Sequence, residues 1–300
     1  MMAESFDGDW LDLREPFDAA SRDAGLATIL SAVLPARPRI LDLGAGTGSL
    51  LRWLGNYIGR AQAWSLVDAD PELIDRAFET TADRAAAAGW GVTWPNRKTL
   101  LVHSPRGAWR VEGLLADLRE APDNLPLHQV DAVVNTALCD LVSEAWVHRV
   151  AAACAEHALP FYAALNVTGR ERFTPAHRAD ALVARGFARD QLRDKGFGGL
   201  ALGARAPRVL AEAFRAHGYT VMQAPSDWLV RTRPISPPVA DFATELVTGM
   251  AGAAGAWERR HRIALRDWAR DRTDQALDGR LGFRIGHADI LCLPPGKEPG

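Results

Sequence analysis

Residues 40–49 read ILDLGAGTGS, an apolar run that ends in the three alternate glycines Gly44, Gly46 and Gly48. The run before the glycines predicts a buried strand, and the apolar pattern after them predicts a helix. Glycines at such a junction let the chain turn tightly and let a ligand approach backbone amides without a Cβ in the way. A dinucleotide fingerprint has the spacing G-x-G-x-x-G, and its last position is Ser49 here. This departure disfavours a nicotinamide-dependent oxidoreductase.

Seven short apolar runs, bounded by turn residues and separated by helical stretches, indicate the fold class. They are nearly all apolar rather than alternating, as in strands that helices cover on both faces of a parallel sheet. The runs are residues 39–43, 63–67, 111–116, 130–134, 161–165, 220–223 and 289–293. This alternation of strands and helices predicts a doubly wound α/β sheet.

Other stretches do not fit the plain alternation. Residues 91–113 hold two apolar runs around a Pro-Arg-Gly turn, which predict an extra hairpin leading into the third strand. Residues 170–206 are charged and glycine-rich, and residues 238–279 read as a helical pair. Because long insertions in a compact domain are more often functional than idle, we expect these two to form a cap over the ligand. Residues 1–35 predict an N-terminal helical segment, and residues 1–300 a single domain.

Composition excludes several classes of protein. The chain is 48% hydrophobic and 24% charged, which is typical of a globular protein. Its formal net charge of -2 provides no overall basic field to attract nucleic acid or an anionic membrane. The N-terminus is acidic and lacks an apolar h-region, so we expect a cytoplasmic protein with no membrane partner. The three cysteines are expected to be buried small hydrophobic residues, and no metal site is predicted.

The motifs along the first half of the chain resemble those of class I S-adenosylmethionine-dependent methyltransferases. LDLGAGTG at 41–48 resembles motif I, and VDADPEL at 67–73 resembles motif II. Residues 116–118 resemble motif III, and residues 130–135 resemble motif IV. The resemblance covers residues 36–170 well, and the rest only through the last two strands. It implies a seven-stranded sheet of order 3-2-1-4-5-7-6 with an antiparallel last strand. The N-terminal helices and the helical cap predicted above complete the expected fold.

The resemblance also implies S-adenosylmethionine as the cofactor. Asp68 would accept hydrogen bonds from both ribose hydroxyls, and Asp117 one from the adenine N6 amine. Asp42 would orient the glycine loop and the ammonium group, while Arg14 on the N-terminal helix would hold the methionine carboxylate. Simpler interpretations are a solvated turn for Asp117 and a solvated side chain for Arg14. The expected cofactor-binding residues are Arg14, Asp42, Gly44, Ala45, Gly46, Gly48, Asp68, Ala69, Asp117, Leu118 and Asn135.

Methyl transfer requires little fixed catalytic machinery. It is an in-line displacement with a neutral leaving thioether, so the protein need only align the reactants, exclude water and remove any proton. Candidates follow strands four and five or lie on the cap, since open α/β sheets bind ligands there. We expect Asp140, His177 and Lys195 to be catalytic, with His177 as a general base and Lys195 in contact with the acceptor. A capping histidine and a flexible surface loop are the simpler alternatives.

The expected activity is methyl transfer to a small-molecule acceptor, because a cap favours an enclosed pocket. Residues 135–138 read NTAL and depart from the Asn/Asp-Pro-Pro-Tyr signature of amino-methyltransferases that act on adenine or glutamine. Two alternatives stay open. Clustered arginines within residues 259–270 would suit a nucleic-acid or protein methyltransferase. A methyltransferase-like protein could also bind the cofactor as a structural or regulatory ligand.

Overall fold

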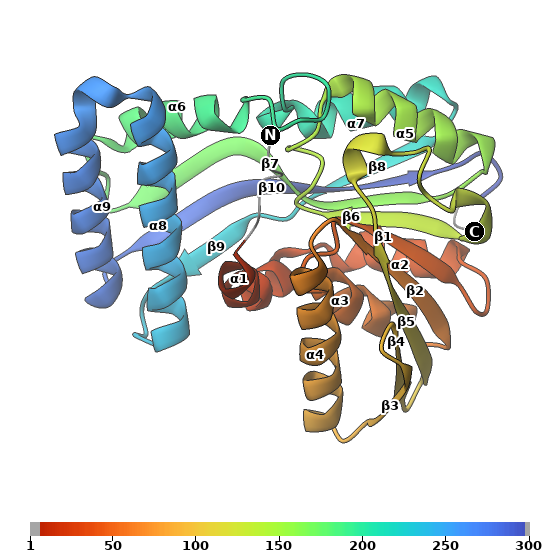
Figure 1. Ribbon diagram of the computed structural model, residues 1–300. Coiled ribbons are helices and arrows are strands. Elements are labelled where there is room, and N and C mark those ends of the chain that lie inside the picture. Colours follow the sequence, from red (N-terminus) through yellow and green to blue (C-terminus); the bar gives the residue numbers. More distant parts are fainter. Residues whose placement is uncertain (1–6, 298–300) are drawn as a thin grey trace.

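The computed structural model describes residues 7–297, in which ten strands form one mixed sheet with helices on both faces (Figure 1). The strands are β1 (Arg39–Leu43), β2 (Gln62–Asp68), β3 (Gly91–Asn96), β4 (Thr99–Ser104), β5 (Gly107–Leu115), β6 (Ala132–Thr136), β7 (Phe161–Thr174), β8 (Thr220–Pro225), β9 (Trp228–Arg231) and β10 (Gly282–Leu293). The α-helices are α1 (Gly8–Ser21), α2 (Ala24–Val33), α3 (Ser49–Ile58), α4 (Pro71–Ala87), α5 (Glu144–Glu156), α6 (Asp180–Gln191), α7 (Ala206–Ala216), α8 (Pro237–Trp257) and α9 (Arg262–Leu277). The short 3₁₀ helices are η1 (Leu118–Glu120), η2 (Leu127–Gln129), η3 (Gly203–Arg205) and η4 (Arg259–His261).

The sheet is longer than the sequence predicts. Its order is β3-β4-β5-β2-β1-β6-β7-β10-β8, and β9 pairs with one end of β10. The prediction of a seven-stranded sheet is therefore wrong, because β3, β4 and β9 extend it to ten strands. The seven predicted strands keep their relative order within the longer one. The last of them, β10, is antiparallel to both β7 and β8, as expected.

The region 91–113 contains more strands than the predicted hairpin. β4 pairs antiparallel with β5, and β3 pairs antiparallel with β4, so β5 is both the third parallel strand and the end of a meander. β3 is exposed along nearly its whole length. Because little of it is buried, its sequence has no apolar run that would have indicated a strand.

The central strands are buried on both faces, which explains their apolar sequences. Leu41 and Val133 pack into the core beneath α5 and α7. Their neighbours Ile40 and Val134 pack into a second core on the other face, beneath α2, α3 and α4 (Figure 1). Successive residues of one strand thus pack against opposite helical layers, as a doubly wound sheet requires.

β7 and β10 run past their predicted ends as a long antiparallel pair. β7 continues to Thr174 and β10 begins at Gly282, so residues 170–174 belong to a strand and not to a cap. The predicted helical pair in 238–279 is present as α8 and α9. These helices and α6 pack on the strand extension around a third core that includes Trp268 and Phe283 (Figure 1).

Candidate active site

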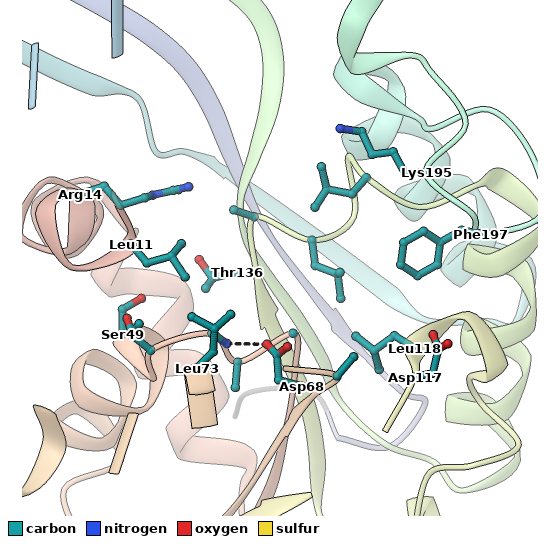
Figure 2. Close-up of a pocket in the computed structure, with 18 of the residues that line it drawn as sticks. Leu11, Arg14, Ser49, Asp68, Leu73, Asp117, Leu118, Thr136, Lys195 and Phe197 are labelled. Atoms are coloured by element: carbon teal, nitrogen blue, oxygen red, sulfur yellow. Dashed lines mark hydrogen bonds between the residues drawn. The ribbon is translucent and has the colours of Figure 1, made fainter. Parts of the chain in front are cut away.

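A cavity lies where the glycine loop, the ends of β2 and β6, α1 and the loop after α6 meet (Figure 2). Most of the residues predicted to bind the cofactor line this cavity, and one of the predicted catalytic residues does. These residues are Arg14, Gly44, Ala45, Gly46, Asp68, Ala69, Asp117, Leu118 and Lys195. Residues from five separate segments of the chain therefore converge on one cavity at the carboxyl ends of the parallel strands.

The glycine loop takes a backbone conformation that other residues rarely adopt. Gly44, Gly46 and Gly48 have φ angles of +64°, +52° and +81°, all in the left-handed region. A Cβ at Gly46 would lie 3.1 Å from Cδ1 of Leu11, which belongs to α1. The loop therefore needs glycine both for its turn and for the close approach of α1.

Asp68, at the carboxyl end of β2, braces the glycine loop. One carboxylate oxygen accepts a 2.9 Å hydrogen bond from the Gly46 amide, and the other accepts one of 3.1 Å from the Asp70 amide. Burial raises the pKa of the Asp68 carboxyl, while these backbone hydrogen bonds oppose the rise. The carboxylate faces the cavity beside the loop, which is the place expected for a ribose ligand (Figure 2).

Asp117 lines the cavity, but its carboxylate is already paired. Arg119 Nε donates to both oxygens of Asp117, at 2.9 and 2.8 Å. Hydrogen bonds from this guanidinium hold the pKa of the Asp117 carboxyl below its usual range. Arg119 also lines the cavity and was not predicted. A hydrogen bond from adenine to Asp117 would therefore share this carboxylate with Arg119.

Three predicted cofactor residues do not line the cavity. Gly48 caps the N-terminus of α3, and Asn135 is buried and accepts a hydrogen bond from Cys139 Sγ at 3.3 Å. Asp42 is fully buried, and neither of its oxygens has a hydrogen-bond partner within residues 7–297. Burial raises the pKa of Asp42 to about 8, although Arg22 opposes the rise.

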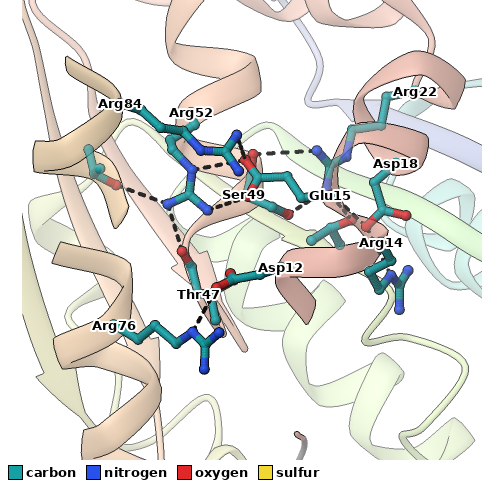
Figure 3. Close-up of polar contacts among 12 residues, drawn as sticks. Asp12, Arg14, Glu15, Asp18, Arg22, Thr47, Ser49, Arg52, Arg76 and Arg84 are labelled. Atoms are coloured by element: carbon teal, nitrogen blue, oxygen red, sulfur yellow. Dashed lines mark hydrogen bonds and ion pairs between the residues drawn. The ribbon is translucent and has the colours of Figure 1, made fainter. Parts of the chain in front are cut away.

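Helix α1 is fastened against the glycine loop by arginines from two other helices (Figure 3). The buried Glu15 carboxylate accepts hydrogen bonds from Arg52 of α3, at 2.6 and 2.9 Å, and from Arg84 of α4, at 2.8 Å. Arg52 Nη1 also donates to the carbonyl of Thr47 at 2.6 Å. One arginine thus joins α1 to the glycine loop, so α1 forms a fixed wall of the cavity.

The remaining catalytic candidates lie in different places. Asp140 is buried beside the cavity, and its Oδ1 has no hydrogen-bond partner in the described part of the chain. Burial raises the pKa of Asp140, and the charges of Lys195 and Arg14 oppose the rise. His177 Nε2 lies 3.3 Å from Oδ2 of Asp271 in α9, outside the cavity lining. This placement favours the simpler interpretation of His177 as a structural residue.

Sequence reasoning missed several residues that line the cavity. Leu11 and Asp18 lie on the same helical face as Arg14, three and four positions away, so helical spacing could have identified them. Phe197 belongs to the same glycine-rich run as Lys195 and packs edge-on against Trp146, with ring centroids 6.2 Å apart. The 238–279 helices, by contrast, contribute no residue to the cavity lining.

Among residues 7–297, no group of three or more His, Cys, Asp or Glu side chains is arranged to hold a metal ion. In the same part of the chain, none of the helices combines the length and the apolar character that crossing a bilayer requires.

Comparisons with known proteins give short or weak likenesses. No protein-family model matches the chain. The biotin biosynthesis bifunctional protein BioCD of Bordetella avium is 45% identical over 49 residues, which are 16% of this chain and only 10% of that protein. The cyclopropane-fatty-acyl-phospholipid synthase-like protein of Lactobacillus casei is 13% identical, with a TM-score of 0.49 over 93% of this chain and 98% of that one.

The YcgJ protein from Bacillus subtilis is similar to the same degree. It is 15% identical, with a TM-score of 0.48 over 92% of this chain and 98% of that one. At these identities and scores we draw no functional conclusion from either structure.

Proposed function

We propose that this protein is an S-adenosylmethionine-dependent methyltransferase that acts on a small molecule. The observation that carries the proposal is the glycine loop, which enters the cavity at positive φ while the carboxylate of Asp68 faces the same cavity. Cofactor titration by calorimetry tests it. We expect S-adenosylmethionine and S-adenosylhomocysteine to bind and NAD not to bind; binding of NAD alone would contradict the proposal.

The cavity has the features that this cofactor needs. Gly44 and Gly46 line the cavity with left-handed backbone, and a Cβ at Gly46 would lie only 3.1 Å from Leu11, so the loop needs glycine there. Asp68 would accept hydrogen bonds from the ribose hydroxyls, with Leu118 beside the adenine. When bound, the cofactor supplies an electrophilic methyl group on a sulfonium. The chain would align the acceptor with that group and exclude water.

The acceptor is proposed to be a small molecule because the cavity is bounded on the acceptor side. Lys195 and Phe197, from the loop after α6, stand over the cavity opposite α1 (Figure 2). The arginine cluster of 259–270, which could have favoured a nucleic acid, contributes nothing to the lining. Within that cluster, Arg270 is paired with Asp267 and Asp271.

Asp68→Ala should weaken S-adenosylhomocysteine binding at least tenfold. The change removes two charge-assisted hydrogen bonds to the ribose, each contributing about 1.5–3 kcal/mol, and also the acceptor of the Gly46 amide. Calorimetric titration measures the dissociation constant. Asp70→Ala is the matched control, because it removes a neighbouring carboxylate that caps α4 and lies outside the cavity lining. An unchanged dissociation constant in Asp68→Ala would show that Asp68 does not bind the ribose.

Lys195→Ala should lower turnover of an acceptor at least tenfold and leave S-adenosylmethionine affinity within about twofold. The reason is its position on the loop after α6, on the wall away from Asp68. Turnover is followed by release of S-adenosylhomocysteine with any acceptor found by screening. Equal losses of turnover and cofactor affinity would place Lys195 at the cofactor instead. If neither turnover nor cofactor affinity changes, the loop that carries Lys195 is a solvated surface loop without a role in binding.

A further inference from the structure

Two cationic side chains stand on opposite walls at one end of the cavity. Arg14 comes from α1, and Lys195 comes from the loop after α6 (Figure 2). Burial raises the pKa of the Asp140 carboxyl, and the charges of Lys195 and Arg14 oppose this rise. Burial lowers the pKa of His287 in β10, and the charge of Arg14 lowers it further. This end therefore holds a guanidinium and an ammonium group together with the Asp18 carboxylate that pairs with Arg14, and it is separate from the carboxylate of Asp68 at the glycine loop.

The guanidinium of Arg14 is held firmly from behind. Its Nε donates to Asp18 Oδ2 at 3.0 Å, and Asp18 Oδ1 accepts a 3.0 Å hydrogen bond from Trp228 Nε1. The Cζ of Arg14 lies 4.9 Å from the centroid of the Trp228 ring, a cation–π distance. The side chain of Arg14 is only 13% exposed. These contacts fix the plane and the direction of the guanidinium before any ligand arrives.

The opposite edge of the Arg14 guanidinium is open. Neither terminal nitrogen makes a hydrogen bond within residues 7–297, and the side chain points into the cavity (Figure 2). Two parallel N–H groups on a pre-oriented guanidinium match the two oxygens of a carboxylate. Asp18 cannot serve as that carboxylate, because Nε and Trp228 already engage its oxygens.

We propose that this end of the cavity holds the acceptor by a carboxylate group, paired with the open edge of Arg14 and attracted by Lys195 from the opposite wall. The inference rests on the proposed function, since it specifies the acceptor of that reaction. The bound sulfonium would add a positive charge near Arg14 and Lys195, and the negative charge of an anionic acceptor would oppose it. Leu141 and Phe197 line the same cavity and suit an apolar body behind the carboxylate.

The test compares small acids with their own amides on protein saturated with S-adenosylhomocysteine. Benzoate with benzamide and propionate with propionamide are the probes, titrated by ligand-observed NMR. The acid of at least one pair should bind about tenfold more tightly than its amide. Arg14→Gln and Lys195→Gln should each reduce the ratio of the amide's dissociation constant to the acid's. In Arg14→Gln this ratio should fall below two. Arg14→Lys keeps the charge without the planar fork and should give an intermediate ratio.

The controls separate this inference from the proposed function. Arg39→Gln alters an arginine that is paired with Asp131 outside the cavity lining, and it should keep the full preference for the acid. If S-adenosylhomocysteine does not bind the unmodified protein, the proposed function itself fails. If it binds but neither acid is preferred over its amide, only this inference is overturned. A tenfold loss of S-adenosylhomocysteine affinity in Arg14→Gln, with the acid preference intact, would assign Arg14 to the methionine carboxylate and would also overturn it.

Discussion

Gly46→Val should abolish S-adenosylmethionine binding, with the dissociation constant rising at least a hundredfold. The glycine has φ +52°, which a β-branched residue adopts only under strain, and its Cβ position lies 3.1 Å from Leu11. A branched side chain would occupy the space above the loop and shift the amide that bonds to Asp68. Calorimetry measures the loss, and circular dichroism checks that the fold remains.

Gly89→Val is the matched control for this substitution. Gly89 also has a left-handed φ, +75°, but a Cβ there would have no atom within 4 Å. It follows α4 and lies outside the cavity lining, so its valine variant should suffer similar backbone strain and bind the cofactor normally. Micromolar affinity retained in Gly46→Val would contradict the assignment of the glycine loop. Equal losses in both variants would attribute the effect to stability alone.

Asp42→Asn should remove a large part of the pH dependence of stability between about pH 4 and pH 8. Burial raises the pKa of Asp42 in the folded protein to about 8, whereas the unfolded carboxyl titrates near its ordinary value of 3.8. Between these values the unfolded chain releases a proton that the folded chain keeps. Stability is therefore lost as the pH rises through this window, by up to about 1.4 kcal/mol per pH unit.

The measurement is the free energy of unfolding of both proteins in denaturant at several pH values. Relative to the unmodified protein, Asp42→Asn should gain stability steadily from about pH 4 to about pH 8, because asparagine has no proton to lose. Asp131→Asn is a suitable control, since Asp131 is partly exposed and pairs with Arg39 at the start of β1. Parallel pH profiles for the unmodified protein and Asp42→Asn would show that Asp42 is charged in the fold.

The sequence predicted the central strands and the glycine loop because both depend on local pattern. A strand buried on both faces is mostly apolar at successive positions. Residues 40–43 are apolar except for Asp42, and residues 132–134 are all apolar. Three positions within five residues have left-handed φ angles, which favour glycine, and these positions are Gly44, Gly46 and Gly48. The exposed strand β3 and the extension of β7 past residue 165 could not be found in this way. Partly exposed strands lack a continuous apolar run.

The arrangement of Arg14 and Lys195 at one end of the cavity depends on tertiary structure alone. Asp18 and Trp228 are 210 positions apart, yet their hydrogen bond directs the guanidinium of Arg14 into the cavity. The sequence suggested Arg14 and Lys195 separately, but it did not place them on facing walls. The sequence also suggests His177 as a catalytic candidate, but its position beside Asp271 depends on how α9 packs. Local residue patterns determine which strands and turns form, whereas the meeting of distant side chains depends on how the helices pack onto the sheet.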